Sequence, residues 1–400
     1  MREYQSFAPA ALAQPAAAYT QYDGLHGAAL SLASRFRGAE LRIPDLMKVF
    51  AGWPFSTSPH LARLRALFDT TLDGCIRDEK KREALKRADF GWLIALWYPD
   101  SEWAELEAVS YLGLWLFVWD DEIDVIETDF SKSAELALLH HRSTLAYVRR
   151  ALGVSAAGDD DSNNNNNDDI NKDIDNDEGS APENMAVFGR FGELTRGTMS
   201  LAQRQRLSNE LHSFVAQVAA EHVFHLDCRI PSPEQYREIR RGTAAVMPVV
   251  VLAEYMTRTE MPEVISSSPA FRVLESTTVD LIWLINDLYS LPKELADDTV
   301  LSIIPVLLHS GSSGSSRWTL DAVVERILAD IRASMDEFEG AAKELRALGA
   351  GDSDATAAAA ETFILYCRRL TAGVVLWTIQ SPRYGILDCT NVDGSVTIQL

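Results

Sequence analysis

Two short stretches of the sequence place oxygen-bearing side chains at helical spacing. In the first, WDDEIDVIE, Asp124 lies four residues after Asp120 and three after Asp121. On a helix such residues share a face with Cβ atoms about 5–6 Å apart, and like charges that close raise one another's pKa. No Lys or Arg lies within the run to balance them. A divalent cation, magnesium in particular, would balance them; a solvated acidic helix end is the alternative.

The second stretch is WLINDLYSLPKELADD, in which Asn286, Ser290 and Glu294 are spaced i, i+4 and i+8. Each step of four advances about 40° around a helix, so the three side chains can share one stripe. Amide, hydroxyl and carboxylate oxygens are all ligands for a hard cation. Lys293 lies beside the stripe, where it could meet a phosphate. The alternative is an ordinary polar face that follows the apolar run VDLIWLI.

Pro292 interrupts the second stretch. It removes an amide that would bond to the carbonyl of Leu288, and it can kink the helix. A kink at this position would displace Glu294 from the stripe.

The elements that must position these residues are expected to be helices. Apolar residues recur at intervals of three and four from Pro59 to Pro99, and the segment from about Glu102 to Ile123 is apolar nearly all round, so it should be buried. Further helices are expected at 133–152, 185–224, 233–255, 269–289, 300–308, 320–345 and 355–379. There is no run of alternating strand residues and no internal repeat. We therefore predict a single all-α domain of roughly ten or more helices.

Composition divides the chain into a domain, an insertion and two tails. Residues 1–45 are Ala-rich and are expected to be a poorly ordered tail, 46–386 the domain, and 387–400 a C-terminal tail. Residues 155–184 are rich in Asp and Asn and contain a run of five Asn. Such a segment buries too little apolar surface to offset its ordering entropy, so we expect a disordered insertion within the domain.

Charge and cysteine usage exclude several classes of protein. The 400 residues carry a net charge of −21, which argues against a nucleic-acid partner. The four cysteines form no CxxC pair, so neither a zinc site nor a disulfide framework is expected. We see no signal peptide, and the longest apolar runs are too short to span a bilayer. A soluble, cytoplasmic protein without membrane insertion is expected.

Taken together, the two stretches are more specific than either alone. DDEID (120–124) and NDLYSLPKE (286–294) resemble the aspartate-rich and NSE/DTE motifs of class I terpene synthases. Fungal sesquiterpene synthases of the presilphiperfolanol-synthase type look most similar, from about Ile43 to Tyr384. In YREIRRGTA, Arg240 resembles the family's pyrophosphate-sensing arginine. Other positions resemble its linker, its effector and its RY pair: Thr243, Ala244, and Arg383 with Tyr384.

The resemblance implies a class I terpenoid synthase helical bundle with a central active-site cavity. It also implies magnesium-dependent ionisation of farnesyl diphosphate and cyclisation to a sesquiterpene hydrocarbon or alcohol, with release of diphosphate. Three Mg²⁺ ions are implied, two held by the aspartate-rich motif, chiefly Asp120, and one by Asn286, Ser290 and Glu294. The implied diphosphate ligands are Arg240, Lys293, Arg383 and Tyr384. The implied enzyme acts on a prenyl diphosphate as a monomer or a homodimer.

Aromatic side chains could form the walls of such a cavity, because their faces attract a carbocation without offering a strong nucleophile. Positions relative to the motifs favour Trp97, Phe117 and Trp377, with Phe90, Trp115 and Trp283 as lesser candidates; core packing is the alternative for each. Two other functions remain open, a catalytically silent protein of the same fold and a chain-elongating prenyltransferase. A class II cyclase would need a DxDD acid, and the sequence contains none.

Overall fold

The computed structural model describes Leu32, Arg35, Phe36 and residues 38–124, 134–155, 183–226, 229–296, 299–311 and 318–400. The side chains at 120–124, 134–135, 183–184 and 225–226 are outside this description. The first half of the described chain forms α2 (Leu46–Val49), α3 (Leu61–Cys75), α4 (Glu79–Arg87), α5 (Phe90–Trp97), α6 (Trp103–Asp124), α8 (Ala134–Leu152), α10 (Glu183–Thr195) and α11 (Leu201–Leu226). The second half forms α12 (Pro233–Thr243), α13 (Met247–Val250), α14 (Ala253–Thr257), α15 (Glu263–Ser266), α16 (Pro269–Ala296), α17 (Ile303–Ser310), α18 (Leu320–Asp352) and α19 (Asp354–Gln380).

Several of these helices begin where a side chain caps the first turn. Ser232 and Gln235 form a reciprocal capping box ahead of α12, which has Pro233 at its first turn. Asp78 accepts from the backbone of Lys81 at the start of α4. Such side chains satisfy backbone N–H groups that have no partner within the helix.

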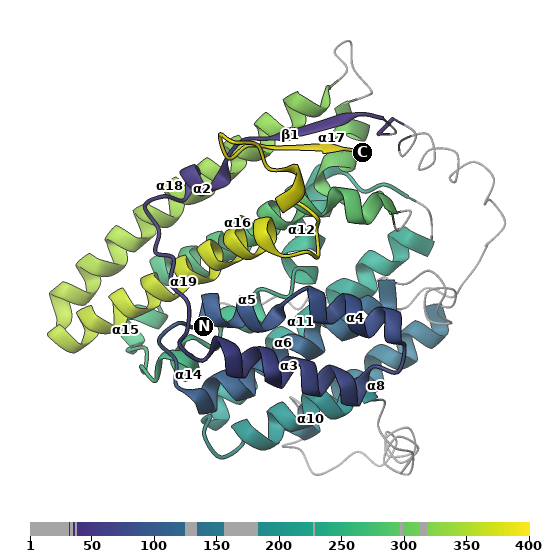
Figure 1. The fold of residues 1–400 in the computed structure, drawn as a ribbon. Helices are drawn as coiled ribbons and strands as arrows, with labels where there is room; N and C mark the ends of the chain where they lie inside the picture. Colours follow the sequence, from purple (N-terminus) through teal and green to yellow (C-terminus); the bar gives the residue numbers. More distant parts are fainter. Residues whose placement is uncertain are drawn as a thin grey trace.

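The helices pack around one continuous apolar core, and this confirms the all-helical fold (Figure 1). Helices α16, α18 and α19 pack against one another, α6 packs on α10, and α8 packs on α11. The predicted burial of α6 is confirmed, because Leu112, Trp115 and Trp119 are each fully buried. The two helices that carry the motifs, α6 and α16, therefore both pack into this core.

The boundaries of both predicted tails need correction, while the predicted disorder of residues 1–31 lies outside the described residues. Strand β1 (Glu40–Ile43) pairs antiparallel with β2 (Val396–Gln399), which follows a short 3-10 turn, η3 (Leu387–Cys389). Figure 1 shows the two strands side by side near the end of α17. Leu41 and Ile398 are buried, so the ordered domain begins before residue 46 and extends beyond residue 386. Strands of four residues are too short to stand out by alternation alone.

Two helix boundaries differ from prediction. The expected helix at 233–255 is broken into α12, α13 and α14, with Ala245 at a φ of 55° just after α12. In contrast, α16 continues through Pro292 to Ala296. Residues 156–182, most of the predicted insertion, lie outside the described residues, so that prediction stays untested.

Helix α19 is long and apolar enough to cross a membrane by length and composition. However, 72% of its most apolar window is buried inside the protein. It packs against α16 and α18, which is how the core helix of a globular domain behaves.

Candidate functional site

The predicted oxygen stripe on α16 is partly assembled. Ser290 Oγ donates a hydrogen bond of 2.5 Å to Glu294 Oε1, so Pro292 does not separate these two side chains. Asn286 lies one turn earlier and is half-buried. Because α16 is unbroken through the proline, residues 286, 290 and 294 keep their helical spacing along one stripe.

Arg240 connects α12 to this stripe. Its Nη2 donates to Asn286 Oδ1 at 2.8 Å, and its Nε donates to Asp287 Oδ1 at the same distance. Asp287 is completely buried and also accepts from Tyr236 Oη at 2.5 Å. Burial, and then the charge of Asp287, raises the pKa of Tyr236, so its hydroxyl keeps its proton and acts as a donor. The predicted diphosphate-binding arginine therefore lies directly against the predicted metal ligand.

The chemistry of the stripe fits a cation. Burial, and then the charge of Asp287, raises the pKa of Glu294 to about 7. The Oε2 atom of Glu294 is buried and makes no hydrogen bond of normal geometry with any described residue. A buried carboxylate oxygen in this state needs a proton or a positive partner. Asn286, Ser290 and Glu294 together thus offer hard oxygen atoms of the kind that Mg²⁺ binds.

Among the residues whose side chains are described, no three His, Cys, Asp or Glu side chains gather closely enough to hold a metal ion. The backbone of Asp120, Asp121 and Asp124 forms the last two turns of α6, but their side chains lie outside the description. The assignment of these aspartates as metal ligands therefore stays a prediction.

Tyr384 joins the polar network to a cluster of aromatic rings. Its hydroxyl accepts from Asn286 Nδ2 at 3.0 Å, and its ring meets Trp377 edge-on with centroids 5.7 Å apart. Phe90 lies 5.8 Å from Trp377 and stacks on Phe117 at 4.2 Å. Tyr384 therefore contacts both the polar side chains of the candidate site and its aromatic rings.

Arg383 lies over the same rings. Its Cζ atom is 5.6 Å from the ring centres of both Phe90 and Phe117 and 6.0 Å from that of Tyr384. This places a guanidinium at cation–π distance from the stacked pair. The faces of Phe90 and Phe117 can therefore stabilise a positive charge.

The other predicted aromatic residues lie elsewhere. Trp97 is half-buried and contacts Tyr98, with no ring contact to the Phe117 cluster among the described residues. Trp115 packs on Phe188 and Trp119, and Trp283 packs on Tyr236. Both tryptophans are therefore placed as core residues. Phe90 belongs to the cluster although its sequence position ranked it below Trp97.

Three further predicted residues occupy the ends of their helices. Thr243 is buried as the last residue of α12, and its Oγ1 makes no hydrogen bond with any described residue. Ala244 is the C-cap of α12, immediately before the left-handed Ala245. Lys293 lies half-buried in the last turns of α16. The roles assigned to these three residues stay predictions.

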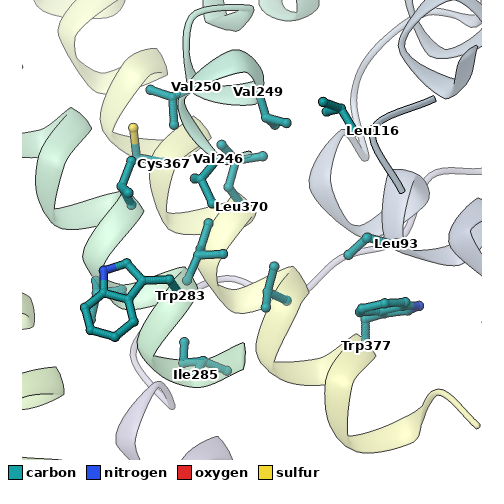
Figure 2. Packing of buried hydrophobic residues seen from close by; sticks show 14 of the residues in the cluster. Leu93, Leu116, Val246, Val249, Val250, Trp283, Ile285, Cys367, Leu370 and Trp377 are labelled. Atoms are coloured by element: carbon teal, nitrogen blue, oxygen red, sulfur yellow. The ribbon is translucent and has the colours of Figure 1, made fainter. Parts of the chain in front are cut away.

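Apolar side chains from several elements line the interior beside the aromatic cluster. Figure 2 shows Leu93 of α5, Leu116 of α6, Val249 of α13 and Trp377 of α19 around one region. All four are buried. None of these four side chains offers a strong nucleophile, which suits a reactive cation.

A hollow of about 360 Å³ lies between α3, α4, α5 and Pro382, and Phe90 of the aromatic cluster is among the residues that line it. Its charged side chains are largely paired, since Arg65 binds Asp89 and Lys86 binds Asp73. Paired charges leave little attraction for a diphosphate. The Arg240–Asn286–Tyr384 network is the better candidate site.

Sequence reasoning missed Asp287 and Tyr236. A signal for Tyr236 was present, because it lies four residues before Arg240 and so shares its helix face. Asp287 could have been noticed as an acid that follows an apolar run. Which neighbour it binds depends on how α12 crosses α16.

Comparison with known proteins identifies related sequences. Residues 111–337, more than half of the chain, match the family model "Terpene synthase family 2, C-terminal metal binding". The chain is 25% identical over 363 residues to the sesquiterpene cyclase hepA of Aspergillus oryzae, covering 89% of this chain and 92% of that protein. It is 24% identical over 355 residues to the terpene cyclase braA of Annulohypoxylon truncatum, covering 88% of each.

Solved structures support the same fold. The linalool/nerolidol synthase from Streptomyces clavuligerus, in complex with 2-fluorogeranyl diphosphate, matches with a TM-score of 0.64 and 21% identity. That match covers 82% of this chain and 97% of the other. A single-residue variant of cucumene synthase matches with a TM-score of 0.62 and 21% identity, covering 83% of this chain and 98% of the other.

Proposed function

The chain belongs to the terpene synthase family and is a terpene cyclase that uses a divalent metal, and from that premise we propose that it converts farnesyl diphosphate to a cyclic sesquiterpene with Mg²⁺. The fifteen-carbon substrate is supported by the similarity to a sesquiterpene cyclase. Diphosphate is the second product, and the enzyme is a lyase.

One observation carries the proposal. Arg240, Asn286 and Tyr384 form a continuous hydrogen-bonded chain that ends on the aromatic cluster of Trp377, Phe90 and Phe117. An allylic diphosphate has the same two-part character, with an anionic head and an apolar tail that becomes cationic. The hydrogen-bonded polar side chains suit the anionic head of the substrate, and the aromatic cluster suits its apolar tail.

The residues present can account for ionisation. Arg240, Arg383 and Tyr384 supply N–H and O–H donors for the diphosphate, which leaves as the carbon–oxygen bond breaks. Bound Mg²⁺ supplies positive charge that stabilises the departing diphosphate. Asn286, Ser290 and Glu294 would hold one ion, and Asp120, Asp121 and Asp124 would hold two.

The aromatic rings and the apolar side chains around them then stabilise the carbocation and shield it from water. The stacked faces of Phe90 and Phe117 stabilise positive charge without donating a bond. Buried side chains such as Leu93 and Leu116 exclude water, which would otherwise capture the cation early (Figure 2).

Purified protein incubated with farnesyl diphosphate, with and without Mg²⁺, tests the proposal by gas chromatography–mass spectrometry. A cyclic sesquiterpene that appears only with Mg²⁺ is expected, and its mass separates hydrocarbon from alcohol. Geranyl and geranylgeranyl diphosphate serve as comparison substrates. No product from any of the three would favour the silent protein, and a longer prenyl diphosphate formed after adding isopentenyl diphosphate would favour the prenyltransferase.

A further inference from the structure

The buried carboxylate of Asp287 lies at the junction of three elements. Besides Arg240 and Tyr236 from α12, it accepts from the backbone N–H of Ile303 at 3.1 Å, at the start of α17. Its side chain is 0% exposed, and that of Arg240 is 17% exposed. Three donors hold the carboxylate, so the guanidinium that it binds has a defined position.

That position places Arg240 on the oxygen that a metal ion would need. Arg240 Nη2 lies 2.8 Å from Asn286 Oδ1, while the amide nitrogen of Asn286 is engaged by Tyr384. A guanidinium and a divalent cation on one amide oxygen would repel each other strongly in a partly buried site. The Asn286 oxygen therefore already accepts a hydrogen bond from a cationic side chain.

We propose that Asp287 is a positioning residue that holds Arg240 across Asn286, so that Arg240 blocks this metal-ligand oxygen until a diphosphate draws the guanidinium away. The inference rests on the proposed function, because it takes Asn286 as a ligand and diphosphate as the anion. Asp287 keeps Nε in place while the Nη atoms turn from the amide to the phosphate. Metal and diphosphate binding are then coupled through this chain's own side chains, and the coupling is reciprocal.

The structure contains a matched control for this arrangement. Arg241 and Asp280 form a second arginine–aspartate pair between the same two helices, and this pair is bidentate, with distances of 2.7 and 2.6 Å. Arg241 does not contact Asn286, and its side chain is 57% exposed. Changes to this pair loosen the α12–α16 contact but leave Arg240 and Asn286 untouched.

The first experiment titrates the full chain with Mn²⁺ alone and follows free Mn²⁺ by electron paramagnetic resonance. Arg240→Lys keeps the charge but lacks the planar fork that reaches both Asp287 and Asn286. We expect it to bind Mn²⁺ about five- to tenfold more tightly than the wild type, because a charge-assisted hydrogen bond no longer competes. Arg241→Lys should bind like the wild type, and Arg240→Lys should have no effect in an Asn286→Ala background.

The second experiment measures the affinity of the metal-free protein for inorganic diphosphate by calorimetry. Asp287→Glu conserves charge but moves the carboxylate by about one methylene, so we expect affinity to fall about tenfold. Asp280→Glu should leave the affinity unchanged. The lysine experiment does not alter Asp287, so it decides the blocking role of Arg240 even if Asp287→Glu fails to fold.

The outcomes separate the two proposals. Arg240→Lys that binds Mn²⁺ no more tightly than the wild type, or equal tightening in the Asn286→Ala background, overturns the blocking role. Equal loss of diphosphate affinity in Asp287→Glu and Asp280→Glu overturns the positioning role. A wild-type protein that binds no Mn²⁺ even with diphosphate overturns the proposed function as well.

Discussion

Replacement of Phe90 by leucine tests whether the aromatic cluster stabilises a carbocation. Phe90 is 2% exposed, stacks on Phe117 at 4.2 Å and has Arg383 5.6 Å from its ring centre. Leucine keeps most of the buried apolar surface but removes the π-face. The lost aromatic pair and cation–π contact together predict a folding cost of about 1–2 kcal/mol.

The effect on catalysis should be of similar size in free energy, and it is measured separately as a loss of rate. A desolvated cation–π contact contributes about 2 kcal/mol, which corresponds to about a thirtyfold change in rate if it acts only in the transition state. We therefore expect Phe90→Leu to lower kcat/KM by about ten- to thirtyfold. Products should shift toward acyclic or early-quenched terpenes, because the cationic intermediates are less stabilised.

The assay is steady-state turnover of farnesyl diphosphate with the product profile read by gas chromatography–mass spectrometry. Phe188→Leu is the matched control, since Phe188 is fully buried and packs on Trp115 at 4.7 Å, away from the cluster. It should lose comparable stability with an unchanged product profile. A Phe90→Leu enzyme with wild-type rate and products, or a Phe188→Leu enzyme whose products change as much, would refute the reasoning.

Three further predictions concern the metal ligands, a strained residue and a buried acid. Asn286→Ala and Asp120→Asn should each abolish detectable turnover while circular dichroism shows a folded protein; normal activity in either variant would remove that residue from the metal site. Ala245→Gly should raise the free energy of unfolding by about 0.5–1 kcal/mol, measured in urea, because glycine adopts the observed φ of 55° without strain. Burial raises the pKa of Glu275 to about 7 even though Arg206 lies 3.7 Å from its Oε1, so below that pH its carboxyl holds a proton that the unfolded chain releases near pH 4.5. Wild-type stability should therefore fall as pH rises from about 5 to about 8, and Glu275→Gln should remove about 1–3 kcal/mol of that fall; an identical pH dependence in both proteins would contradict the assignment.

Much of the fold could be predicted from local pattern. The apolar surface of 102–123 predicted a buried helix, and α6 is buried there. The i, i+4, i+8 spacing placed Asn286, Ser290 and Glu294 on one helix, and α16 carries all three. Helical periodicity is a property of neighbouring residues, so no tertiary information was needed.

The proline and the termini show where local pattern is insufficient. A kink at Pro292 was a reasonable expectation, yet α16 continues to Ala296, because the surrounding packing holds the helix together despite one missing amide bond. Strands β1 and β2 pair although residues 44–395 separate them along the chain. Short strands of this kind form only when the rest of the fold brings the two ends of the domain together.

The composition of the site was thus determined by the sequence, and its connections by the tertiary structure. The motifs contain the proposed oxygen ligands, the arginines and most of the aromatic residues of the candidate site. Only the crossing of α12 over α16 decided that Arg240 bridges Asn286 and Asp287, and only the packing of α5 on α6 and α19 placed Phe90, and not Trp97, on Phe117. Spacing along one helix sets which side chains share a face, whereas the partner that each face meets depends on contacts between residues far apart in the chain.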